Sequence, residues 1–156
     1  METAQAAHVP TISAHQVVYA DASGRAVTGG GLQATRPWIE EDGFRPGTWG
    51  SDLLDGLPSA IFRVDKPRAS AFLYTPLDVI LKSLGTETVV IAGAYTNQCV
   101  VSTARDAWAR DFRVVVVSDA TVAFDPNLHR STLDSLRPLT IQLTTDEMCR
   151  LWEPSK

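Results

Sequence analysis

Short hydrophobic runs alternate along this chain with segments of helical periodicity, and the alternation predicts an α/β fold. Apolar and β-branched runs predict strands at residues 11–19, 59–64, 88–93, 112–117 and 139–143. Helices are expected at residues 2–8, 75–84, 98–110, 126–136 and 145–152. Strands that alternate with helices are typical of βαβ units, so we expect a parallel sheet with helices on both faces.

Two helical segments have clear boundary signals. In the helix at residues 75–84, Thr75 suits the cap, Pro76 suits the first helical position, and Gly85 ends the helix. One or two further helical turns, ended by glycine, are expected at residues 51–56.

Residues 21–50 are rich in turn residues and form a long irregular segment. Loops of this length in a compact domain are typically functional or mobile, and we expect this one to set substrate specificity. Trp38 either lines a pocket for the substrate or anchors the segment to the body, and both interpretations stay open.

Composition narrows the class of protein. The chain has 156 residues, 44% of them hydrophobic and 21% charged, which fits a single soluble globular domain over residues 1–156. The net charge of −4 and the lack of a basic stripe argue against nucleic acid as a partner. No apolar run is long enough to cross a membrane, no signal peptide is evident, and two cysteines do not make a disulfide framework. A cytoplasmic location is therefore expected.

Residues 89–100 predict a buried strand, a turn at Gly93 and the start of a helix. Thr96 and Asn97 suit the N-cap, which places Cys99 in the first helical turn. The helix dipole and the unpaired N–H groups of that turn favour a thiolate, so Cys99 is a candidate nucleophile. The alternative is that Cys99 is a small buried hydrophobic side chain.

Lys66, the segment 95–99 and Asp119 each follow the end of an expected strand. The carboxyl ends of parallel strands meet at one edge of the sheet, where ligands bind. An ammonium group close to a thiol stabilises the thiolate, so Lys66 is a candidate partner of Cys99. The alternative is an ordinary surface lysine.

Three motifs support the first interpretation of both residues. Residues 64–72, Val-Asp-Lys-Pro-Arg-Ala-Ser-Ala-Phe, resemble the lysine motif of the isochorismatase-like cysteine hydrolases. Residues 93–100, Gly-Ala-Tyr-Thr-Asn-Gln-Cys-Val, followed by Thr-Ala-Arg-Asp-Ala at 103–107, resemble the nucleophile motif of that family. Residues 116–121 resemble the strand end that comes next. From about residue 5 onward the chain is similar to this family, which includes nicotinamidases, N-carbamoylsarcosine and ureidoacrylate amidohydrolases, and isochorismatases.

The resemblance implies a three-layer α/β/α fold with a mostly parallel, Rossmann-like sheet. It also implies a small-molecule substrate, no cofactor, and a homo-oligomer, either a dimer or a tetramer. The early Asp-x-His-x-x-x-His motif of zinc-binding nicotinamidases is absent from the sequence, and the three histidines lack metal-ligand spacing, so no metal is expected.

Site residues follow from the same resemblance. Cys99 corresponds to the nucleophile, and Lys66 to the residue that holds the thiolate and the catalytic carboxylate. The Ala94–Tyr95 peptide bond is expected to be cis, and the N–H groups of Tyr95 and Cys99 to form the oxyanion hole. The implied reaction is hydrolysis of a C–N bond in an amide, carbamoyl or ureido compound through a thioester. Candidate substrate-binding residues are Trp38, Arg68, Phe72 and Tyr95.

The sequence departs from the family at its general base, an aspartate at the end of the first strand. That strand is apparently missing here, although it lies centrally in the family, between those matching residues 11–19 and 88–93. Three explanations are open: the chain is a trimmed form, a second chain supplies the strand and its aspartate, or the sheet has closed up. His15 is a candidate substitute base because a histidine transfers protons near neutral pH, with a structural histidine as the alternative. Asp21 and Asp65 are weaker candidates.

Two functions therefore compete. The first is a cysteine hydrolase, and the second is a catalytically incomplete member that acts as a binding or scaffold subunit. The isochorismate branch of the family is disfavoured because its members often lack the cysteine that is present here.

Overall fold

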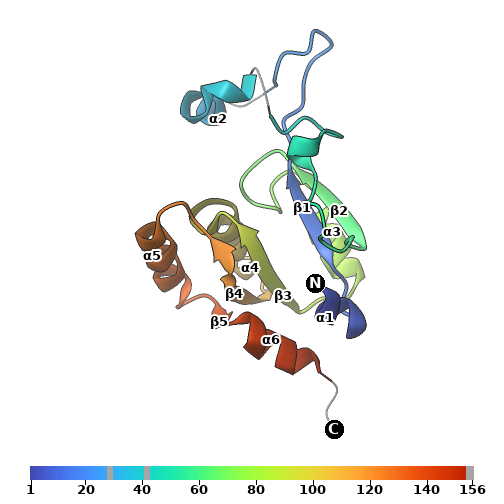
Figure 1. Ribbon diagram of the computed structural model, residues 1–156, viewed down its shortest axis with the longest axis vertical. Coiled ribbons are helices and arrows are strands. Elements are labelled where there is room, and N and C mark those ends of the chain that lie inside the picture. Colours follow the sequence, from blue (N-terminus) through green and yellow to red (C-terminus); the bar gives the residue numbers. More distant parts are fainter. Residues whose placement is uncertain (28–29, 41–42, 154–156) are drawn as a thin grey trace.

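Five parallel strands form two separate sheets in the computed structural model, which describes residues 1–27, 30–40 and 43–153. Strands β1 (Ile12–Gln16) and β2 (Phe62–Lys66) make a two-stranded sheet. Strands β3 (Thr88–Ala94), β4 (Arg113–Val122) and β5 (Ile141–Leu143) make a three-stranded sheet in that order. Figure 1 shows β1 and β3 as the strands that face each other across the boundary between the sheets.

The helices follow the strands in the order expected of βαβ units. Their bounds are α1 (Glu2–Ala6), α2 (Gly30–Thr35), α3 (Leu77–Ser83), α4 (Val101–Trp108), α5 (Pro126–Leu136) and α6 (Thr145–Trp152). Three short turns of other geometry complete the set: η1 (Pro37–Glu40), η2 (Trp49–Ser51) and η3 (Thr96–Val100). None of the helices in the described residues is long and apolar enough to cross a membrane.

Side-chain caps fix where the later helices begin. The Asp125 carboxylate accepts a hydrogen bond from the Asn127 N–H at the start of α5, where Pro126 occupies the first turn. A reciprocal capping box between Thr144 and Glu147 starts α6. These local interactions explain why both helices begin where the sequence predicts.

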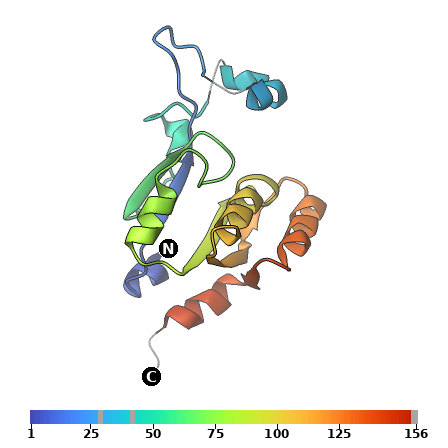
Figure 2. The ribbon, with the colours of Figure 1, turned by 180° about the vertical axis from the view of Figure 1, so that it is seen from behind.

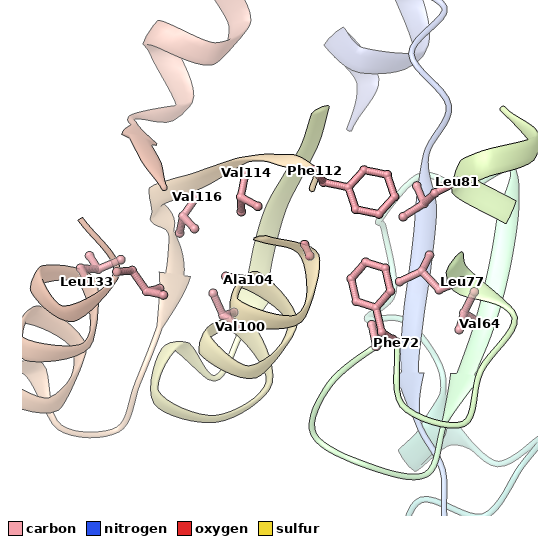
Figure 3. Close-up of a cluster of buried hydrophobic side chains, with 13 residues drawn as sticks. Val64, Phe72, Leu77, Leu81, Val100, Ala104, Phe112, Val114, Val116 and Leu133 are labelled. Carbon is pink, nitrogen blue, oxygen red and sulfur yellow. The ribbon is translucent and has the colours of Figure 1, made fainter. Parts of the chain in front are cut away.

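The main hydrophobic core lies on one face of the sheets and joins them (Figure 3). Buried side chains from β2 and α3 meet others from α4, β4 and α5 there, and they include Val64, Phe72, Leu77, Leu81, Val100, Ala104, Phe112, Val114, Val116 and Leu133. A smaller cluster on the opposite face contains Val115, Val117 and Met148. Because successive residues of a strand point to opposite faces, the four consecutive valines of β4 serve both clusters.

Helices therefore cover both faces, and the fold has the expected α/β/α arrangement. Helices α4 and α5 pack on one face of β4, whereas α6 packs on the other face and contacts α1. Figure 2, seen from behind, shows α2 beyond the carboxyl ends of the strands and apart from these layers.

Several expected boundaries differ from the structure. Strand β2 runs from Phe62 to Lys66 and not over residues 59–64, because its register with β1 pairs Ile12 with Phe62 and Gln16 with Lys66. Strand β4 continues to Val122, five residues beyond the expected end. The helical turns expected at residues 51–56 are absent, since the chain there forms only η2 and a turn in which Gly56 has φ 85°.

The boundary between the two sheets lies where the resemblance places the first strand of the family. Among the described residues, β1 pairs with β2 and β3 pairs with β4, and the two sheets are not hydrogen-bonded to each other. The sheet has therefore not closed up around the missing strand, and β1 and β3 each keep a free edge.

Candidate active site

Cys99 lies in a wide helical turn that directly follows β3. The peptide bond between Ala94 and Tyr95 is cis, at the position where the resemblance implied it. In η3, the Val100 N–H donates to the Tyr95 carbonyl five residues earlier, at 3.2 Å, which is the bonding pattern of a π-helical turn. Such turns are rare in proteins overall, and those that occur are often at functional sites.

Thr96 does not cap this helix as the sequence suggested. Tyr95 occupies the cap position in extended conformation and makes no side-chain cap bond. The Thr96 side chain is fully buried, and its hydroxyl lies 2.8 Å from Nδ1 of His129 in α5. A side-chain bond to a neighbouring helix thus holds the start of the Cys99 turn.

Lys66 is buried at the end of β2 and reaches Cys99 across the boundary between the sheets. Its Nζ donates to Cys99 Sγ at 3.2 Å, to Gln16 Oε1 at 2.9 Å and to the Arg68 carbonyl at 3.2 Å. An ammonium group has three hydrogens, so these three acceptors use all of them. Because Gln16 and the Arg68 carbonyl are neutral, a negative charge on Cys99 would be the compensating charge for this ammonium.

His15 lies away from this pair. Its register partner is Asp65, whereas the next residue, Gln16, is the one that meets Lys66, and neighbouring strand residues point to opposite faces. The buried His15 ring places Nδ1 2.6 Å from the Ser51 carbonyl and Nε2 2.9 Å from the Ser13 hydroxyl. The Ser51 carbonyl can only accept, so Nδ1 carries a proton, and this arrangement is that of a structural histidine.

The other candidate carboxylates are engaged locally. Asp65 forms an ion pair with Arg63 at 2.8 Å. The exposed Asp21 accepts bonds from the Ser23 hydroxyl and N–H, which lower the pKa of its carboxyl group. Asp119 accepts bonds from the Thr145 hydroxyl and N–H, which lower the pKa of that carboxyl group too and tie β4 to α6. Within the described residues, no recorded contact joins a carboxylate to Cys99 or to Lys66.

The four candidate substrate-binding residues lie in different surroundings. Tyr95 follows the cis bond, and its ring centroid is 4.5 Å from that of the exposed Phe124. Arg68 is half-buried and donates to the Pro67 carbonyl. Trp38 is half exposed and packs near Phe44.

Phe72, in contrast, is 6% exposed and belongs to the hydrophobic core. Its ring centroid lies 6.0 Å from that of Phe112, and the guanidinium of Arg110 lies over the Phe72 ring. We therefore do not propose Phe72 as a wall of the substrate site.

Sequence reasoning missed three side chains of this site. Gln16 holds Lys66, and its place opposite Lys66 at a strand end was a usable signal. Gln98, directly before Cys99, accepts a hydrogen bond from Arg36 Nη2. Arg36 belongs to the irregular segment and lies 62 positions before Gln98 in the sequence, and no local sequence pattern predicts such a contact.

No group of three or more His, Cys, Asp or Glu side chains within the described part of the chain is arranged to hold a metal ion. The Lys66 ammonium contacts Cys99, and the neighbouring residues of the turn, Gln98 and Thr96, bond to Arg36 and His129. These groups suit the stabilisation of an anionic nucleophile and the binding of a polar substrate.

Comparisons with known proteins identify the family of the chain. The model of the isochorismatase domain matches residues 1–148. The chain is 42% identical over 89 residues to a ureidoacrylate amidohydrolase, RutB, of Methylorubrum extorquens, covering 55% of this chain and 36% of that protein. It is 35% identical over 103 residues to a probable inactive nicotinamidase of Arabidopsis thaliana, covering 64% of this chain and 53% of that protein.

A solved cysteine hydrolase from Pseudomonas syringae superimposes with a TM-score of 0.85 at 25% identity, covering 97% of this chain and 75% of that one. The chain thus spans about a third to a half of the length of the curated relatives that it matches. The family match extends over both sheets and all three motifs, and the resemblance inferred from the sequence is confirmed. The chain belongs to the isochorismatase family.

Proposed function

We propose that this chain carries the nucleophile half of a cysteine hydrolase that cleaves a C–N bond in a small amide, carbamoyl or ureido compound. One observation carries the proposal: a buried ammonium, Lys66 Nζ, lies 3.2 Å from Cys99 Sγ in a π-helical turn. An ammonium held there by neutral acceptors stabilises a thiolate, the form of cysteine that attacks carbonyl carbon.

The reaction would proceed in two steps with balanced bonds. Cys99 Sγ attacks the carbonyl carbon, a C–S bond forms, and the C–N bond breaks as the leaving nitrogen takes a proton. Water then attacks the thioester, releasing the acid and returning the thiol. The N–H groups of Tyr95 and Cys99 are proposed to bind the carbonyl oxygen during both attacks, and losing one such donor typically costs about 10²–10³-fold in rate.

The proton transfers need a base, and the described residues bring none to Cys99. We propose that the base is an aspartate on a strand between the free edges of β1 and β3, where it would approach both Lys66 and Cys99. A chain in which no carboxylate reaches Cys99 would bind the substrate and present the nucleophile without efficient turnover.

A second function is favoured by this same lack of a contacting carboxylate: a catalytically incomplete subunit that binds or scaffolds. The two functions differ in what Cys99 does. A binding subunit has no need of a reactive thiolate, so Cys99→Ala would leave its binding and assembly intact. Formation of a homo-oligomer and a cytoplasmic location remain proposals under both functions.

Alkylation of Cys99 at neutral pH tests the nucleophile directly. We expect Cys99 to react with iodoacetamide at least about tenfold faster than Cys149, because the ammonium of Lys66 favours the thiolate at Cys99. Cys149 is a matched control in the same chain: it is also partly buried, but its neighbour is the neutral Thr3 hydroxyl. Equal rates at the two cysteines would contradict the proposal.

Turnover across a panel of small amides and ureido acids separates the two functions. A missing base predicts slow hydrolysis that rises when formate or acetate is added, because a small carboxylate can enter and accept the proton. Cys99→Ala should abolish the rescued activity. Reactive Cys99 with no turnover at any carboxylate concentration would favour the incomplete subunit.

A further inference from the structure

Arg36 contacts Gln98, the residue directly before the proposed nucleophile. Its Nη2 donates to Oε1 of Gln98, and Gln98 directly precedes Cys99 in the η3 turn. The bond joins the irregular segment to the start of the nucleophile helix across 62 positions of sequence. A guanidinium group is therefore held by the residue that directly precedes the proposed nucleophile.

The segment that carries Arg36 is packed and hydrogen-bonded. Arg36 sits between α2 and η1, where its N–H donates to the Leu32 carbonyl and its own carbonyl accepts from the Ile39 N–H. Ile39 is 1% exposed and forms a small hydrophobic cluster with Val18 and Ala26. This cluster fixes the backbone of Arg36 relative to the end of β1.

The charge of Arg36 is not balanced by a carboxylate within the described residues. Gln98 is a neutral acceptor, and the recorded ion pairs of the structure involve other cations: Arg63, Lys82, Arg110, Arg113 and Arg137. Lys66 likewise donates to two neutral atoms and to the cysteine sulfur.

Lys66 in contact with Cys99, and Arg36 in contact with the preceding Gln98, thus bring two cations to a segment with one prospective thiolate. Such a field attracts an anion, and a guanidinium binds a carboxylate through two parallel N–H···O bonds. An amide contact to Gln98 uses one of the five donors of Arg36 and leaves the others for a ligand.

We infer that Arg36 is a specificity-determining residue that binds a carboxylate on the substrate, so that the preferred substrates are anionic amides or ureido acids. This inference rests on the proposed function for the identity of the reaction, but the charge preference itself does not depend on turnover. It also gives the irregular segment a definite task, which is the selection of substrates by charge.

Iodoacetate and iodoacetamide are a matched pair of probes for Cys99. Both alkylate thiols, but iodoacetate carries a carboxylate where iodoacetamide carries a neutral amide. The readout is the alkylation rate of Cys99 with iodoacetate divided by its rate with iodoacetamide. Every protein tested also carries Cys149→Ser, so that only one thiol reacts. We expect the ratio to exceed that of free cysteine in the parent chain. Arg36→Met should lower it about three- to tenfold, the effect of one unscreened charge at several ångströms.

Two variants control the interpretation. Arg36→Lys keeps the charge but not the paired N–H donors, so its ratio should lie between those of the parent and of Arg36→Met, which a purely structural role of the guanidinium would not predict. Arg137→Ala removes an exposed arginine that pairs with Asp134 in α5, and the ratio should stay unchanged. A ratio that is equal in the parent and in Arg36→Met overturns the inference, as does an equal fall in Arg137→Ala.

Equilibrium binding gives the same readout without chemistry. N-carbamoylglycine should bind the parent chain more tightly than N-carbamoylglycinamide, and Arg36→Met should remove most of that difference. If Cys99 proves unreactive, the proposed function fails while this binding difference still decides the role of Arg36. Equal binding of the acid and the amide to the parent chain overturns the inference.

Discussion

Replacing Thr96 by valine removes one hydrogen bond at the start of the nucleophile turn and changes little else. The Thr96 side chain is fully buried, so its hydroxyl has no water to bind in place of His129 Nδ1, which lies 2.8 Å away. Valine keeps the shape of threonine, so the substitution leaves no cavity. His129 is half-buried, and its ring nitrogen can turn to water when the hydroxyl is lost.

The expected cost follows from these surroundings. One neutral hydrogen bond contributes about 0.5–1.5 kcal/mol net, and no cavity or stranded partner adds to it. Thr96→Val should therefore lower the free energy of unfolding by about 1 kcal/mol, equivalent to about 2–4 °C in melting temperature for a chain of this size. Thr96→Ser keeps the bond and loses one buried methyl group, at about 0.8 kcal/mol.

A double-mutant cycle with His129→Ala distinguishes the loss of the hydrogen bond from the loss of the buried methyl group. Urea unfolding of the parent, the single variants and the double variants gives the coupling energy between the two side chains. We expect about 0.5–1.5 kcal/mol of coupling for the Thr96→Val cycle and a smaller change for Thr96→Ser. A coupling below about 0.3 kcal/mol in the valine cycle would refute the claim that this bond holds the turn.

Two further substitutions test the packing and the capping of the fold. Leu136→Ala truncates a side chain of α5 that is 0% exposed in the core, and we expect it to lower the free energy of unfolding by about 2–5 kcal/mol. In the same urea unfolding assay, the control Leu151→Ala, at an exposed position, should lower it by less than about 0.5 kcal/mol. Hydrogen bonds from the Thr144 N–H and hydroxyl lower the pKa of Glu147, so the unfolded chain binds more protons than the folded one and this contribution to stability is lost as pH falls through the folded pKa. Glu147→Gln should therefore flatten the decline of stability between about pH 5 and pH 2, and an unaltered pH profile would contradict that role.

Local signals explain which elements the sequence located well. Helices α5 and α6 begin where expected because their caps are made by residues within three positions of the helix start. The strand β2 was placed about three residues too early, because its bounds depend on pairing with β1, some 50 positions away. Hydrophobic pattern alone marks where a strand lies but not where its partner ends.

The same distinction applies to the site. Lys66 and Cys99 were paired in advance because each follows a strand end, and parallel strands bring those ends to one edge. The contacts of Arg36 with Gln98 and of His129 with Thr96 were not foreseen, because each joins distant segments without a shared motif. His15 was placed near the site by its strand, but the alternation of the strand turns its ring to the other face.

The contact between Lys66 and Cys99 has a mechanical consequence. Lys66 lies on the two-stranded sheet and Cys99 follows the three-stranded sheet, and in the described part of the chain no backbone ladder links these sheets. The distance between Lys66 Nζ and Cys99 Sγ therefore depends on the separation of the two sheets. We therefore expect a change in the spacing of β1 and β3 to alter the Lys66–Cys99 contact, and the alkylation rate of Cys99 would measure that change.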